Sequence, residues 1–138
     1  MESKTEFKSV FKTPANRGRG VRRDVKNEIA YNINKVSADK KGQFQFILYV
    51  GINLIKKARL IDGDRVDVQI SQDGKYGLIK RVPTGGRALS RKHAKNTGKI
   101  VGAYNENLPW VNSITTLENV VIDDEGILFE WPASTTRG

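Results

Sequence analysis

The sequence predicts a mostly β protein of the α+β class, with small sheets in a swapped-hairpin-like arrangement and one or two short helices. Three observations favour this class. Apolar and polar residues alternate with the period of a strand over 65–70. Asp73-Gly74 then supplies a hairpin turn signal. Apolar residues at helical spacing are found in two short stretches, 21–36 and 52–60.

The chain is expected to begin with a flexible basic arm over residues 1–20, because NRGRG mixes Gly with Arg and no apolar period is sustained there. The first folded unit is predicted over 21–83. It opens with an amphipathic helix, whose apolar face is formed by Val21, Val25, Ile29, Ile33 and Val36.

The rest of this unit is predicted as a strand, a short helix and a hairpin. FQFILYV (44–50) is rich in aromatic and β-branched residues, which indicates a largely buried strand. INLIKKARL (52–60) predicts one short helix, and Gly63 ends it because glycine readily adopts the left-handed conformation at a helix C-terminus. The two hairpin strands follow, and Pro83 stops the second one because it has no N–H donor for the sheet.

This order of elements resembles the AbrB/SpoVT family of swapped-hairpin DNA-binding domains. The resemblance implies an intertwined dimer formed by exchange of hairpins, with basic residues around the loop and the short helix contacting DNA. Lys56 stands where family members often carry a contacting Arg, whereas Ile55 occupies the neighbouring position and Gly51 stands where a proline is common. The matching segments, about a third of the chain, are KKGQF (40–44), INLIKKARL (52–60), IDGDRVDVQ (61–69) and DGKYGLIKR (73–81).

A basic linker is predicted over 84–99, because Gly85-Gly86 form a flexible joint and too few apolar residues follow to anchor a helix in a core. The second unit, residues 100–132, is predicted to be β-rich and acidic and to pack on the first. It starts with the strand IVGAY (100–104), and its order of a short helical turn, a strand, Glu125-Gly126 and a strand echoes the first unit. The two units are either related repeats that pair within one molecule, or the second is a further set of strands that completes the sheet. Residues 133–138 are expected to be a flexible tail.

Charge is distributed unevenly along this chain, whose formal net charge is +9. Residues 75–99 hold eight basic side chains and no acidic one, whereas residues 100–138 hold six acidic side chains and one Arg. The basic block favours a polyanionic partner such as nucleic acid or an anionic membrane surface. The acidic third is either a docking face for a protein or a competitor of the polyanion for the basic patch.

Several functional classes are not expected. The chain has no Cys and a single His, His93, so neither a disulfide, a transition-metal site nor a cofactor is predicted. Asp123, Asp124 and Glu125 are more typical of a solvated turn than of a cation site. There is no nucleophile elbow, and Ile100 stands where a P-loop has Ser or Thr, so no enzymatic activity is expected. No stretch approaches the roughly 18 apolar residues of a membrane span, which predicts a soluble, cytoplasmic protein without a membrane partner.

The expected function is non-enzymatic nucleic-acid binding by a homo-oligomer such as a homodimer, as a DNA-binding transcription regulator that uses Lys/Arg loops on a β scaffold. One alternative is a single-stranded DNA-binding protein that acts in replication or recruits a polymerase, with aromatic rings stacked on bases. Another is an adaptor whose main partner is a protein. Phe44 and Phe46 are expected in the core, and Trp110 and Trp131 are expected to pack or to meet a protein. The candidate stacking residues are Tyr49, Tyr76 and Tyr104. The candidate nucleic-acid-binding residues are Arg17, Arg19, Arg22, Arg23, Lys56, Lys57, Lys80, Arg81, Arg87, Arg91, Lys92, Lys95 and Lys99.

Overall fold

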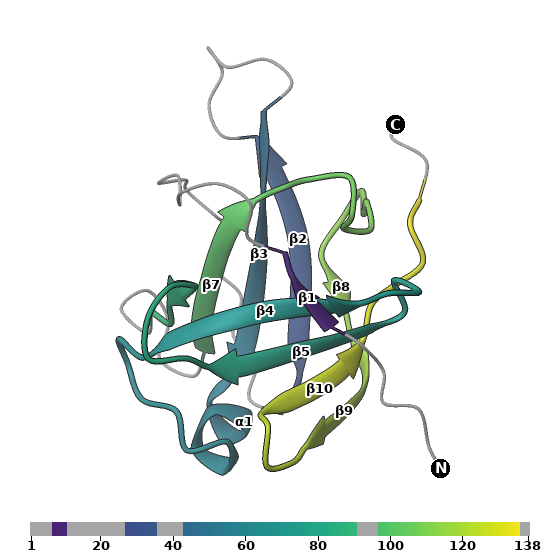
Figure 1. Ribbon diagram of the computed structural model, residues 1–138. Coiled ribbons are helices and arrows are strands. Elements are labelled where there is room, and N and C mark those ends of the chain that lie inside the picture. The colour runs from purple at the N-terminus through teal and green to yellow at the C-terminus, as the bar shows by residue number, and fades with distance from the viewer. Residues whose placement is uncertain (1–6, 11–26, 36–42, 91–96, 136–138) are drawn as a thin grey trace.

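The computed structural model describes residues 7–10, 27–35, 43–90 and 97–135. Two antiparallel sheets and one short helix make up this part of the chain (Figure 1). The strands of one sheet run across those of the other, so that two inner faces meet (Figure 1). The prediction of a mostly β protein with a short helix is confirmed.

The first sheet is built around the predicted hairpin and is antiparallel throughout. The hairpin strands β4 and β5 lie in its middle, and the C-terminal hairpin of β9 and β10 extends it. In spatial order its strands are β1 (Phe7–Ser9), β4 (Arg65–Ser71), β5 (Tyr76–Arg81), β10 (Ile127–Glu130) and β9 (Glu118–Ile122), and β6 (Arg87–Ala88) also pairs with β4.

The second sheet is built around the long buried strand predicted at 44–50. This strand, β3, extends over Phe44–Gly51 and pairs with a neighbour on each side. The helix α1 (Ile52–Lys57) follows it directly and leads to β4 in the first sheet. In spatial order the strands are β7 (Thr97–Ala103), β3, β2 (Ile29–Lys35) and β8 (Thr115–Thr116).

The core lies between the two sheets. Large side chains of both inner faces form one cluster, in which Val68 and Phe129 of the first sheet and Tyr31 and Phe46 of the second are at most 1% exposed. Each buried side chain of this size contributes about 1.5–3 kcal/mol by leaving water. Trp131 closes the cluster with its ring edge-on to Tyr31 and Phe129, at centroid distances of 5.3 and 4.9 Å. The expected core position of Phe46 is therefore confirmed.

The helix expected over 21–36 is wrong for its described part, because residues 29–35 form strand β2. Ile29 and Ile33 are four positions apart, and this spacing puts both on one face of either a helix or a strand. Tyr31 lies between them and is fully buried, and its hydroxyl donates to the carbonyl of Pro109 at 2.7 Å. Residues 29–35 form a strand rather than a helix because all of β2 pairs with β3.

Both ends of the chain are more ordered than expected. The prediction of a flexible arm is wrong for residues 7–10, since β1 pairs with β4. Val10 is fully buried, and its N–H donates to the carbonyl of Val68 at 2.8 Å. The flexible tail is wrong over 133–135. Ser134 accepts the N–H of Trp110 at 3.0 Å, and the N–H of Thr135 donates to the Trp110 carbonyl at 2.8 Å.

The two predicted units take equivalent places in both sheets. The strands β5 and β10 pair at the centre of the first sheet, with β4 and β9 outside them, and the strands that precede the hairpins, β3 and β7, pair in the second sheet. Gly74 and Gly126 of the two turns are 52 positions apart, and the same shift carries β3, β4 and β5 onto ranges that overlap β7, β9 and β10. The helical turn expected in the second unit is wrong, because the described residues 97–135 contain no helix.

Candidate nucleic-acid interface

A tight loop after β5 brings two arginines together. Gly85 and Gly86 have positive φ angles of 77° and 60°, and a Cβ on Gly86 would lie 2.1 Å from the carbonyl oxygen of Val66. Only glycine fits this approach. The loop carbonyls therefore face Arg65, whose Nε donates to Gly85 at 2.8 Å and whose Nη2 donates to Gly86 at 3.1 Å.

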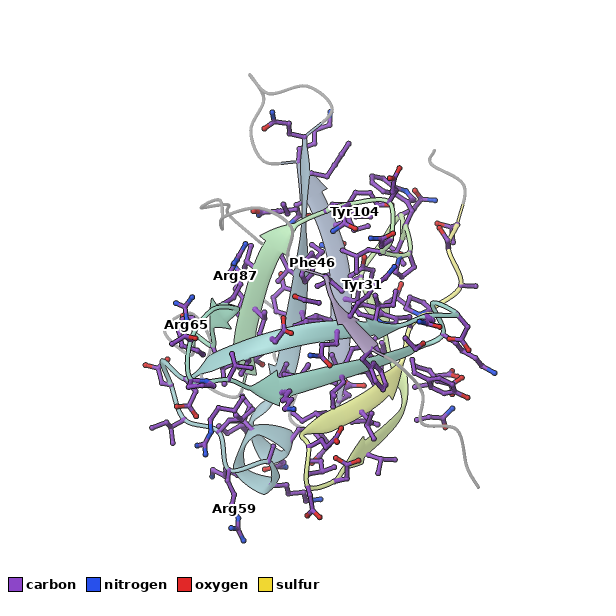
Figure 2. All side chains as sticks on the ribbon, viewed as in Figure 1. Tyr31, Phe46, Arg59, Arg65, Arg87 and Tyr104 are labelled. Atoms are coloured by element: carbon purple, nitrogen blue, oxygen red, sulfur yellow. The ribbon has the colours of Figure 1, made fainter. Side chains whose placement is uncertain are left out.

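The second arginine, Arg87, binds the same loop. Its Nη1 donates to the carbonyl of Gly86 at 2.9 Å, so the guanidinium groups of Arg65 and Arg87 converge on one oxygen. Both arginines lie at the same edge of the molecule (Figure 2). Burial and the positive charge of Arg65 both lower the pKa of Arg87. The fold thus holds two like charges close together, and a bound anion would relieve their repulsion.

Two more cations lie at this end of the sheets. Arg81 stands opposite Val66 in the ladder, its side chain is 63% exposed, and its Nη1 is 3.9 Å from Asp64. Such an exposed pair contributes little. Lys99 of β7 exchanges two backbone hydrogen bonds with Ser90, of 2.7 and 3.0 Å, and burial lowers its pKa. We call the group of Arg65, Arg81, Arg87 and Lys99 the basic corner.

The linker expected over 84–99 is wrong where the chain is described. Residues 87–88 form β6, Leu89 is 1% exposed in the core, and the Ser90–Lys99 bridge joins this segment to β7. One well-placed leucine and a few backbone hydrogen bonds fix the segment without the apolar face that a helix would need.

The structure brings the side chains of Arg65 and Arg87 together at one carbonyl and places Arg81 and Lys99 on the neighbouring strands. Arg81, Arg87 and Lys99 belong to the basic corner, whereas Arg65 was interpreted only as the solvent side of a strand. Its bonds reach carbonyls 20 and 21 positions away. The Gly-Gly pair signalled in the sequence that the backbone approaches another segment closely at this point. It did not indicate that this segment is the start of β4, which carries Arg65.

The other described candidates lie apart from the basic corner. Lys80 is exposed and stands opposite Asp67 in the hairpin. Lys56 and Lys57 are exposed in the last turn of α1, where cations favour the helix dipole. Outside the described residues lie Arg17, Arg19, Arg22, Arg23, Arg91, Lys92 and Lys95.

The stacking candidates differ in exposure. The prediction that Tyr49 stacks on a base is wrong, since its side chain is 2% exposed in a small cluster with Ala30 and Ile47. Burial also raises the pKa of Tyr49. Tyr104 is half-buried with its ring edge-on to Trp110 at 5.4 Å. Tyr76 is 38% exposed, with the ammonium of Lys75 5.5 Å from its ring centroid, and it stays a prediction.

The acidic hairpin β9–β10 carries its charge at an exposed turn. The carboxylate of Asp123 accepts the N–H groups of Glu125 and Gly126 at 2.8 and 3.2 Å, which is the geometry of a turn residue. In the described part of the chain, no group of three or more His, Asp or Glu side chains is placed to hold a metal ion. The described helix α1 is also too short to cross a membrane.

Comparisons of this chain with family models, with curated proteins and with solved structures found no match. The function of the basic corner is therefore inferred from its own geometry and charge.

Proposed function

We propose that this protein binds nucleic acid without catalysing a reaction, and that the basic corner contacts the phosphate backbone. The observation that carries the proposal is the convergence of Arg65 and Arg87 on the carbonyl of Gly86. A guanidinium has five N–H donors in a planar fork that suits phosphate oxygens, so the two bonds that fix Arg65 to the loop do not exhaust its donors. A pre-positioned arginine also loses little freedom when it binds.

The basic corner extends over both sheets. Arg65 and Arg81 come from the first sheet, and Lys99 comes from the second. Cations that lie on different elements can follow a backbone over several phosphates, and their joint release of counterions sets the affinity.

Duplex DNA is the form that we favour. Single-strand binders stack successive bases on exposed rings. Among the three tyrosine candidates, Tyr49 is buried, Tyr104 packs against Trp110, and Tyr76 begins β5 at the opposite end from Arg81. The role that we propose is regulation of transcription, since a protein that occupies duplex DNA without modifying it controls access to it. The exposed ring of Tyr76 supports single-strand binding as the second candidate.

The test is a pair of neutralised variants. We expect R65Q/R87Q to weaken binding to a duplex by about tenfold or more, because a hydrogen bond to a charged group contributes about 1.5–3 kcal/mol. The slope of log K against log salt should become shallower by roughly 0.9 for each phosphate that the variant no longer neutralises. Lys8 and Lys35 are exposed on β1 and β2. K8Q/K35Q removes the same charge elsewhere and should bind nearly as the parent does.

Each variant is measured with single-stranded and double-stranded oligonucleotides of matched sequence, and thermal unfolding checks that the loop of Gly85 and Gly86 is intact. A parent protein that binds neither form at about 50 mM salt would remove the proposal. Equal losses of affinity in both variant pairs would place the binding site away from the basic corner. Tighter binding of the single strand would select the second candidate.

A further inference from the structure

The outer face of the first sheet carries a groove of about 600 Å³. Its apolar lining comes from Phe7, Tyr76, Val121, Leu128 and Phe129. Two of these side chains are well exposed, Tyr76 at 38% and Val121 at 55%. The solvent face of an antiparallel sheet is usually polar, so an apolar groove here indicates a surface that a partner covers.

The polar lining of the same groove is acidic. Asp123, Glu125 and Glu130 contribute carboxylates, and no basic side chain is among the described residues that line it. Asn119, with a positive φ of 54°, donates its Nδ2 to the carboxylate of Glu130 and so fixes this edge. Negative potential repels phosphates and attracts cations. The occupant is therefore expected to combine an apolar side chain with positive charge.

The chain itself presents such a surface at the end of α1. Lys56, Lys57 and Arg59 are exposed there, and Ile61 is 67% exposed. The turn is firm, because the N–H of Ile61 donates to the carboxylate of Asp64 at 2.9 Å and its carbonyl accepts the N–H of Asp64 at 3.1 Å. Figure 2 shows Arg59 pointing away from the body of the molecule. We call the group of Lys56, Lys57, Arg59 and Ile61 the knob.

The backbone of Arg59 supports a role for the knob. Its φ is 59°, a left-handed conformation after a helix that glycine adopts at lower cost. Strained positions of this kind are often kept for a surface function. Here the strain places a third cation beside Lys56 and Lys57.

We propose that the knob of one copy of this chain docks into the groove of a second copy. Among the described residues the exposed large hydrophobic side chains are Ile61, Tyr76 and Val121, one on the knob and two in the groove. The three knob cations match the three groove carboxylates in sign, and one opposite charge accompanies each set, Asp62 after Ile61 and Lys75 over the ring of Tyr76. In one molecule both surfaces are exposed, so each is open to a neighbour.

The association joins two different surfaces, so it is heterologous. A knob and a groove of this size bury little area, and the association is expected to be weak in solution. Copies bound side by side on one polyanion would reach a high effective concentration, which strengthens a weak association by mass action. This inference stands apart from the basic corner, since it uses none of its residues.

The experiment uses one variant for each surface. Ile61→Asp places a carboxylate on the knob, where it meets the acidic groove, and Val121→Arg places a cation in the groove, where it meets the basic knob. Sedimentation is followed up to about 1 mM protein, the concentration at which an association of about 4 kcal/mol is half complete. We expect the parent to self-associate and each variant to sediment as a monomer. An equimolar mixture should form a 1:1 complex, because one variant keeps an intact groove and the other an intact knob.

Three controls accompany the mixture. Thr116→Asp, an exposed change on the second sheet, should associate as the parent does. A short duplex that holds one copy should bind both variants about as well as the parent, so a defect in self-association is distinguished from a defect in nucleic-acid binding. Arg59→Gly should raise the midpoint of thermal unfolding by about 4 °C while weakening association, because it removes both the strain and a knob cation.

A charge exchange covers the case in which Ile61→Asp or Val121→Arg does not fold. Lys57→Glu and Glu125→Lys should each weaken association, and the two changes in one chain should restore it. A parent that stays monomeric, variants that associate normally, or a mixture that stays monomeric would each overturn the proposal. If the parent stays monomeric, the occupant of the groove would instead be a cationic segment of another protein.

Discussion

The two hairpins of the first sheet have the same place in the fold and opposite surfaces. β5 of the first and β10 of the second pair at the centre of the sheet, with β4 and β9 outside them. Residues 75–99, which include β5, have eight basic side chains and no acidic one, whereas residues 100–138, which include β9 and β10, have six acidic side chains and one basic one. The inward-facing side chains of each strand pack in the core, whereas the outward-facing side chains contact solvent and can differ in charge between the two hairpins.

This difference underlies the two kinds of partner that we propose for one scaffold. The basic hairpin leads into the loop that fixes Arg65 and Arg87, which suits phosphate. The acidic hairpin forms the groove with Val121 and Leu128, which suits a cationic apolar surface. The first sheet thus contributes to the proposed site for a polyanion and carries the proposed docking groove at a separate place.

The largest expected effect concerns the equivalent turn glycines. A Cβ on Gly126 would lie 2.1 Å from the carbonyl oxygen of Ile79, whereas a Cβ on Gly74 meets nothing within 4 Å. Gly74→Ala should cost about 1–2 kcal/mol through its positive φ alone. Gly126→Ala should cost at least about 3 kcal/mol, because its φ of 147° is almost restricted to glycine and the backbones clash. Denaturant unfolding of both variants measures the difference, and equal costs would contradict the close packing of the two hairpins.

A smaller effect is expected from the charges themselves. Lys80→Glu with Arg81→Glu should weaken duplex binding by roughly tenfold, because it reverses one cation of the basic corner, Arg81, and a second cation on the same strand. Asp124→Lys with Glu125→Lys, on the other hairpin, should strengthen binding by a few-fold, since it lowers long-range repulsion of phosphate. Both effects should shrink at high salt. Fluorescence anisotropy with a labelled duplex measures them, and changes of the same sign would argue against separate partners.

The smallest effect is the pH dependence of the basic hairpin's turn. Asp73 accepts the hydroxyl of Ser71 at 2.6 Å and the N–H of Lys75 at 3.0 Å, and these bonds lower the pKa of Asp73. A lowered folded-state pKa means that the stabilisation is present at neutral pH and is lost as the pH falls below about 4. Asp73→Asn should therefore destabilise the protein more at pH 6 than at pH 3.

Asp124→Asn is the matched control, since it removes the same charge from the exposed turn of the other hairpin. Urea unfolding at the two pH values compares the variants. A loss of stability in Asp73→Asn that is equal at both pH values would show that the ionised carboxylate does not hold this turn.

Local sequence signals predicted the first hairpin and its helix closely. Alternation fixed the inward face of Val66, Val68 and Ile70, and Asp73-Gly74 formed the expected turn, because both features depend on residues a few positions apart. The predicted end of this helix at Gly63 is wrong, because α1 ends at Lys57 and the left-handed residue after it is Arg59. Gly63, with a positive φ of 89°, belongs to the turn that precedes β4. The basic block made Arg81, Arg87 and Lys99 binding candidates, and this role stays a prediction; their arrangement did not follow from the sequence.

What the sequence determined by itself was the class of fold, the turns and the sign of charge along the chain, since these follow from the residues and their close neighbours. The tertiary structure alone decided that residues 29–35 are a strand, because Ile29 and Ile33 fit a helix equally well until β3 offers its backbone bonds. It also decided that Arg65 joins Arg87, through a loop that lies 20 positions further along the chain. Contacts between distant segments select among local conformations of nearly equal free energy, and for this reason the two proposed binding surfaces could be located only on the folded chain.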